Sequence, residues 1–171
     1  CIDLDTQELL WELDFNDNHS SLYSEIVGYA NKAYFEQHDH ANRISVIVEA
    51  DIPTGDTTIV YTCKTPEGFN GTTLTGISVR DGRYLEFFTR DGTEEKFQFV
   101  YRVLDLQNGE METERQINNR FHNYGVNPER VIIGDNTYFG IGEEVFAINR
   151  FTGEPVWYRH TKGYACSSII A

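Results

Sequence analysis

The sequence predicts an all-β fold made of repeated antiparallel strands, on three observations. The 171-residue chain is rich in residues that pack well on pleated surfaces, with 11 Phe, 10 Tyr and many Val, Ile and Thr. Several segments alternate apolar and polar residues, which is the period of a half-buried strand. Dipeptides of Asn or Asp followed by Gly separate these segments, and such pairs favour tight hairpins.

The individual elements follow from the same signals. We expect strands at 43–50, 73–79 and 96–104, where the alternation is clearest. Helix is expected to be scarce: 20–33 is equally compatible with a strand, and 112–120 lacks a clear apolar stripe. No linker or shift in composition divides the chain, so one domain is predicted for residues 1–171. Hairpin turns are expected at Asn70-Gly71, Asp81-Gly82, Asp91-Gly92 and Asn108-Gly109.

An internal repeat is the most informative feature of the sequence. The segment 147–157, Ala-Ile-Asn-Arg-Phe-Thr-Gly-Glu-Pro-Val-Trp, aligns without a gap with 1–11, Cys-Ile-Asp-Leu-Asp-Thr-Gln-Glu-Leu-Leu-Trp. With weaker copies near 49 and 103, the starts lie 44–54 residues apart. That spacing is close to the roughly 40–50 residues of a four-stranded propeller blade. The positions that carry the repeat are Asp3, Thr6, Trp11, Asp51, Thr54, Gly55, Asp105, Gly109, Asn149, Thr152, Gly153 and Trp157.

Each position of the repeat has an expected physical role. The Asp or Asn should accept hydrogen bonds from backbone N–H groups of a turn. The Gly should have a positive φ, where a Cβ is unfavourable. Trp11 and Trp157, the only tryptophans of the chain, share one column and are predicted to cover a neighbouring blade with their rings. Gln7 replaces the Gly of the first copy, which predicts a strained residue or a different turn there.

The pattern Ala-x-Asp-x-x-Thr-Gly-x-x-x-Trp resembles the tryptophan-docking motif of PQQ-like quinoprotein repeats. Such repeats occur in quinoprotein dehydrogenases and in non-enzymatic propellers such as the BamB-type outer-membrane assembly lipoproteins. In the first copy Cys1 stands for Ala and Gln7 for Gly, and the copies near 49 and 103 keep only the Asp and the turn. The resemblance implies a β-propeller of four-stranded antiparallel blades, with about 3.5–4 repeats in this chain.

Two arrangements of those repeats are expected from the resemblance and stay open. The chain is either a piece of a propeller of about six to eight blades, or a small propeller that closes by pairing its terminal strands. Ring closure removes the exposed sheet edges that favour aggregation, which gives the second arrangement a physical basis.

The net charge of the chain limits the classes of partner that it is expected to bind. With 14 basic against 27 acidic residues, the net charge is −13. Nucleic-acid binding is not expected, because affinity for phosphates needs clustered Lys and Arg. A basic protein partner, or plain solubility, fits better. No run approaches the roughly 18 apolar residues that a transmembrane helix needs.

The sequence predicts no catalytic, cofactor-binding or metal-binding residue. The acidic loop 14–17 lacks the spacing of a calcium loop, and His38 and His40 lack a third metal ligand in view. The glycines at 134, 140 and 142 lie in a β-hairpin context, which does not suit phosphate binding. The vicinal cysteine pair that the resemblance implies for a quinoprotein enzyme is missing from the sequence.

The favoured function is a non-catalytic propeller that docks a basic protein partner. Two alternatives stay open: a fragment of a PQQ-dependent quinoprotein oxidoreductase, and a bacterial immunity-type protein that neutralises a basic toxin. The BamB-like version of the first function implies the bacterial periplasm, and the immunity-type version implies the cytoplasm. The residues do not choose between these compartments.

Overall fold

The computed structural model describes residues 1–13, 20–22, 26–65, 74–93, 96–117, 130–141 and 144–160. Within these ranges all regular structure is β, so the prediction of an all-β fold is confirmed. The strands are β1 (Ser20–Leu22), β2 (Val27–Tyr29), β3 (Lys32–Asp39), β4 (Ile44–Asp51), β5 (Thr57–Lys64), β6 (Leu74–Arg80), β7 (Tyr84–Thr93), β8 (Lys96–Asp105), β9 (Glu110–Ile117), β10 (Arg130–Ile133), β11 (Asn136–Ile141), β12 (Glu144–Asn149) and β13 (Pro155–His160).

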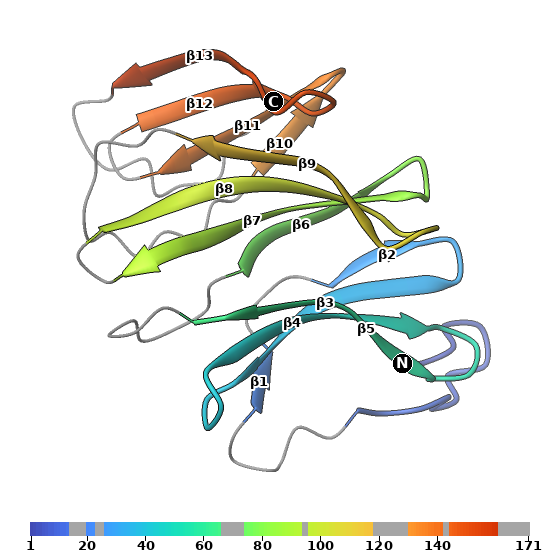
Figure 1. The fold of residues 1–171 in the computed structure, drawn as a ribbon. Helices are drawn as coiled ribbons and strands as arrows, with labels where there is room; N and C mark the ends of the chain where they lie inside the picture. Colours follow the sequence, from blue (N-terminus) through green and yellow to red (C-terminus); the bar gives the residue numbers. More distant parts are fainter. Residues whose placement is uncertain are drawn as a thin grey trace.

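The strands form three antiparallel sheets in chain order, which Figure 1 shows stacked one above another. The second sheet is the meander β6-β7-β8-β9, and the third is the meander β10-β11-β12-β13. The first sheet has the same pattern, but two short strands share its first strand position. Strands β1 and β2 pair with different halves of β3, and β4 and β5 follow. Each sheet is therefore one unit of four strand positions.

The strand and turn predictions agree with the structure at most positions. The predicted strands 43–50, 73–79 and 96–104 correspond to β4, β6 and β8. The Asp81-Gly82 pair joins β6 to β7, with φ values of 53° and 63°. The Asp91-Gly92 pair instead lies inside β7, so the turn predicted there is wrong. Asn70-Gly71 lies outside the described residues.

Neither helix candidate is helical where the structure describes it. The range 20–33 contains β1 and β2, and the range 112–120 begins inside β9. Strand β9 lies at the edge of its sheet, and most of its side chains are exposed. An exposed edge strand does not need strict alternation of apolar residues, which is why its pattern looked ambiguous.

Apolar clusters join each sheet to the next. One cluster contains Ile47 of the first sheet with Leu85 and Phe87 of the second. Another contains Phe88 of the second sheet with Phe139 and Phe146 of the third. Successive residues of a strand point to opposite faces, so Phe87 and Phe88 hold the middle sheet to its two neighbours.

The described strands do not close a ring. Strand β13 is the edge of the third sheet, and no pairing among these strands links that sheet to the first. The finer prediction of a propeller therefore goes beyond the observed architecture. In the same ranges of the chain there is no helix long and apolar enough to cross a membrane.

Candidate functional site

All four repeat copies fold into the same turn. In each copy the residue four positions after the Asp or Asn donates its backbone N–H to the carbonyl of that Asp or Asn across 2.8 Å. This donor residue has a positive φ in every copy, between 61° and 78°. The donor and acceptor pairs are Gln7 and Asp3, Gly55 and Asp51, Gly109 and Asp105, and Gly153 and Asn149. Gln7 thus occupies a backbone conformation that favours glycine.

Asp or Asn side chains stabilise these turns. Asp3 Oδ1 accepts from the backbone N–H groups of Asp5 and Thr6, at 2.9 and 3.0 Å. Asn149 Oδ1 accepts from those of Phe151 and Thr152, at 2.9 and 3.1 Å. The N–H donors favour the carboxylate, so the pKa of Asp3 lies below its ordinary value. Short polar side chains that accept backbone N–H groups define this turn type.

A second set of bonds ties the repeat turn of each sheet to the turn between the first and second strand positions. The N–H of the residue after the Asp or Asn donates to a carbonyl in the turn between the first and second strand positions, across 2.8–2.9 Å. This turn-to-turn bond recurs in all three sheets, as Ile52 to Asn31, Leu106 to Arg83 and Arg150 to Asp135. These two turns of every sheet therefore lie at the same end of the stack, on the right in Figure 1. We call this the turn end.

Trp11 packs on the turn of the next repeat, as the sequence predicts for this column. Its Nε1 donates to the carbonyl of Ile52 across 2.6 Å. Its ring crosses Gly55 so closely that a Cβ on Gly55 would lie 2.8 Å from Trp11 Cγ. Gly55 is therefore required both by its φ of 78° and by the tryptophan.

Trp157 does not pack on a turn among the described residues, so its predicted role stays a prediction. It lies on the edge strand β13 with 41% of its surface exposed. Its ring lies beside that of Tyr138 in β11, two strand positions away in the same sheet, at a centroid distance of 6.0 Å. The reason is that no described turn lies beyond β13 for the ring to cover.

In the second and third copies, strands β5 and β9 carry other side chains in the tryptophan column. Arg115 and Thr113 cover the turn at Gly153, and Arg115 Nη2 forms an ion pair with Glu154 at 2.5 Å. Ile59, in the tryptophan column of the second copy, is 60% exposed, and nothing lies within 4 Å of a Cβ built on Gly109. The tryptophan is thus one of several side chains that can join a repeat to the next.

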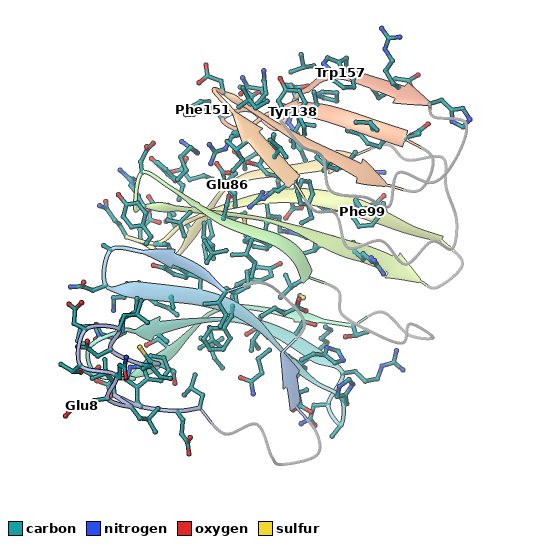
Figure 2. The ribbon with its side chains drawn as sticks, turned by 180° about the vertical axis from the view of Figure 1, so that it is seen from behind. Glu8, Glu86, Phe99, Tyr138, Phe151 and Trp157 are labelled. Carbon is teal, nitrogen blue, oxygen red and sulfur yellow. The ribbon has the colours of Figure 1, made fainter. Side chains whose placement is uncertain are left out.

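The turn end carries one exposed acidic residue per repeat. Each is the fifth residue after the Asp or Asn, directly following the left-handed residue's position. Figure 2 shows Glu8 at the turn end of the N-terminal segment. We call this set the acidic row: Glu8, Asp56, Glu110 and Glu154. The aligned copies share this acidic column, but nothing in the sequence pattern assigned it a role.

A buried ion cluster lies between the second and third sheets, near Phe151 in Figure 2. Glu86, with no exposed surface, accepts from Arg80 Nε at 2.7 Å and from Arg150 Nε at 2.9 Å. Arg130 Nη2 donates to the Glu86 carbonyl at 3.0 Å. Burial lowers the pKa of Arg130 to about 10. Four charges from both sheets thus stabilise one interface, which sequence patterns alone did not indicate.

The two histidines weighed as metal ligands lie side by side, but no third ligand joins them among the described residues. His38 is buried, with its Nδ1 2.9 Å from Ser45 Oγ and its ring against His40 at 4.6 Å. No group of three His, Cys, Asp or Glu side chains among the described residues could hold a metal ion. Gly134 forms the turn between β10 and β11, with a φ of 57°. The acidic loop 14–17 lies outside the described residues.

Comparison with known proteins gives a likeness of fold. The crystal structure of the computationally designed Ika8 protein matches with a TM-score of 0.52 and 12% sequence identity, over 84% of this chain and 38% of that one. This chain therefore spans less than half the length of Ika8. No protein-family model and no curated protein matches the sequence.

Proposed function

We propose that the chain is a segment of a β-propeller with PQQ-like repeats that serves as a non-catalytic protein-interaction module. Three features support the propeller. The three sheets each have four strand positions that pair antiparallel, and they stack in chain order. The same turn recurs in each repeat with the same hydrogen bonds. The likeness to Ika8 covers most of this chain and only 38% of the other, as expected for some of the units of a larger repeat protein.

The acidic row is the observation that carries the interaction function. Each acidic residue has the same place in its turn, so the row presents carboxylates from successive repeats at the turn end. Glu8, Asp56 and Glu110 are exposed and form no ion pair with any described residue. Charged side chains that are repeated at one end of a scaffold and form no ion pair are available to a partner.

The partner that this row fits is a basic protein segment. The chain carries a net charge of −13, which raises the rate of encounter with a basic surface. Lysine or arginine side chains that reach successive turns would then form charge-assisted hydrogen bonds to the row. The net charge supplies attraction from a distance, while the row supplies the contacts at the turn end.

A lysine-rich peptide tests this proposal, with two variants of equal charge. Glu8→Lys with Glu110→Lys changes two positions of the acidic row. Glu12→Lys with Glu112→Lys changes two other exposed acidic residues and serves as the control. Binding is measured by fluorescence anisotropy of the labelled peptide at several salt concentrations.

We expect the variant of the acidic row to bind the peptide at least about tenfold more weakly than the control variant. Affinity for the unmodified protein should fall as the salt concentration rises. Equal losses in both variants would mean that net charge alone attracts the peptide, and the turn end would then have no special role.

A further inference from the structure

The buried cluster between the second and third sheets has an excess of positive charge. Three arginines contact Glu86, whose side chain has no exposed surface: Arg80, Arg130 and Arg150. Figure 2 shows Glu86 where these two sheets face each other. A guanidinium stays protonated in a protein, so three positive charges share one carboxylate. Buried charges need partners of opposite sign, and one carboxylate does not supply enough of them.

One further carboxylate of the described chain lies within ion-pair distance of these arginines. Asp81 Oδ2 is 3.9 Å from Arg80 Nη1, but the side chain of Asp81 is 75% exposed. With Asp81 included, three positive charges face two negative ones, so a single monovalent anion would balance the cluster. Burial lowers the pKa of Arg130 to about 10, as expected for a guanidinium whose charge its surroundings do not fully compensate.

Two buried polar atoms of the third sheet have no hydrogen-bond partner among the described residues: Arg130 Nη1 and Thr137 Oγ1. Thr137 as a whole has no exposed surface. Nearly all buried polar atoms in proteins are bonded to protein, water or a ligand. Because Arg130 Nη1 and Thr137 Oγ1 can both donate, an anion is an acceptor that would satisfy the two together.

The strand register makes Arg130 and Thr137 neighbours. Arg130 lies opposite Phe139 of β11. Thr137 lies two residues before Phe139, opposite Ile132. Directly opposite residues share a face of the sheet, so Arg130 and Thr137 form a diagonal pair on one face, within reach of a long side chain. Phe139 belongs to the apolar cluster that joins the third sheet to the second, so this face is turned toward the second sheet.

Thr137 also lies between the two arginines that the third sheet contributes to the cluster. It is opposite Ile148 of β12, and Arg150 follows two residues later. Along the strands, Thr137 is therefore two residues from the level of Arg130 on one side and two from the level of Arg150 on the other. Since both arginines donate to Glu86, their guanidinium groups converge near the level of Thr137.

We propose that Arg130 Nη1 and Thr137 Oγ1 bind a small monovalent anion of the chloride type between the second and third sheets. Each atom donates one hydrogen bond to the ion, and the ion balances the charge of the cluster. The neighbouring side chains Phe139 and Ile148 are buried and apolar, so they offer no donors for the additional oxygens of phosphate or sulfate. Strand β10 is a sheet edge and Arg130 is not fully buried, which gives the ion a path from solvent.

The anion site goes beyond the proposed interaction function and does not depend on it. Its two donors belong to the third sheet, whereas the arginines beside it hold Glu86 of the second sheet. Only the folded chain brings these groups together, so the anion stabilises the folded state. The attachment of the third sheet to the second should therefore strengthen as the anion concentration rises.

Urea unfolding at constant ionic strength tests the site, with sodium chloride replacing sodium gluconate. Screening of charges then stays the same, while gluconate is too large an anion for the site. The equilibrium constant of unfolding should fall about tenfold once chloride reaches ten times its dissociation constant. That dissociation constant comes from chloride-35 NMR line widths, measured on the folded protein without urea.

Variants of the two donors assign the effect of chloride to this site. Thr137→Val removes one donor at nearly the same volume, and should lose both the stabilisation by chloride and the excess line width. Thr137→Ser keeps the hydroxyl and should retain both. Arg130→Met removes the other donor, should also lose both, and serves if Thr137→Val does not fold. Thr58→Val removes the hydroxyl of an exposed threonine in β5, and should respond to chloride like the unmodified protein.

Three results would overturn the proposal. Equal stability of the unmodified protein in chloride and in gluconate would mean that water alone satisfies the two atoms. A chloride effect of the same size in the unmodified protein, Thr137→Val and Arg130→Met would mean that chloride binds elsewhere. Loss of the effect in Arg130→Met alone would exclude Thr137 as a ligand of the ion.

Discussion

At the scale of single residues, two buried polar groups of the first sheet are unusual. Glu36 and His38 lie on the same face of β3, and both are hydrogen-bonded to Ser45 of β4. Burial raises the pKa of Glu36 to about 8 and lowers the pKa of His38. Both groups therefore tend to be neutral near pH 7, which reduces the cost of burying them between two sheets.

This leads to a prediction of pH-dependent stability. The folded protein holds the Glu36 proton up to about pH 8, whereas the ordinary pKa is 4.5, so stability falls as the pH rises through that window. The His38 contribution runs the other way and is lost below about pH 6.5. Between pH 6.5 and 7.5 the free energy of unfolding should fall by up to about 1.4 kcal/mol.

Urea unfolding at several pH values measures this fall. In Glu36→Gln the free energy of unfolding should be nearly constant between pH 6.5 and 7.5, because the titrating carboxyl is gone. Glu12→Gln removes an exposed carboxyl and should keep the slope of the unmodified protein. An unchanged slope in Glu36→Gln would assign the pH dependence to another group.

The two tryptophans should differ in their contribution to stability. Trp11→Ala removes a packed ring and the hydrogen bond to Ile52, and should lower the free energy of unfolding by about 2–4 kcal/mol. Trp157→Ala removes a ring from an exposed edge strand, and should cost less than about 1 kcal/mol. Chemical denaturation of the monomer compares them, and equal losses would contradict the structure.

At the scale of elements, much of the fold could be predicted from the sequence. The strands with clear alternation and the Asp81-Gly82 hairpin follow from local pattern, because one face of each central strand is buried. The edge strand β9 could not be predicted in this way, because its exposed side chains show no periodic pattern. The break between β1 and β2 could not be predicted either, because it depends on how both segments pair with β3.

The candidate site was only partly predictable for a similar reason. The repeat located the Asp, Thr and Gly positions, since a turn imposes local demands on residue type. The contacts between sheets depend on tertiary structure, so Arg115 could replace tryptophan without leaving a pattern. The cluster around Glu86 joins residues up to 64 positions apart, and no local spacing could indicate it.

The three turn glycines allow a matched test of docking. All three have a positive φ, so substitution by Ala should cost about 1–2 kcal/mol at each from the backbone alone. Gly109→Ala should show only this cost. Gly55→Ala should cost more, because the rigid Trp11 ring must move. Thermal unfolding provides the comparison, and equal losses at Gly55 and Gly109 would argue against the docked ring.

At the scale of the whole molecule, the stack is held by two different interfaces. The first and second sheets meet through an apolar cluster and the buried pair of Glu36 in β3 and Arg90 in β7. The second and third sheets combine an apolar cluster with the ions around Glu86. In a stack where each unit contacts only its neighbours, stability is the sum of units and interfaces, so one interface can weaken without loss of the rest.

Glu86→Gln should therefore release the third sheet before the others. The change leaves Arg80 and Arg150 buried without their shared carboxylate, and removing one partner of a buried ion pair costs about 3–5 kcal/mol. Native-state hydrogen exchange should show faster exchange in β10–β13, with protection in β3 and β4 retained. Uniform loss of protection would mean that the stack unfolds as one unit.

The bond between the two turns of each sheet has a consequence for how this chain evolves. Both its donor and its acceptor are backbone groups, so no side chain at Ile52, Leu106 or Arg150 is needed to form it. Drift in sequence can therefore proceed while the architecture persists, provided that the left-handed residue and the Asx position survive. Divergence of this kind leaves shape as a better record of ancestry than sequence.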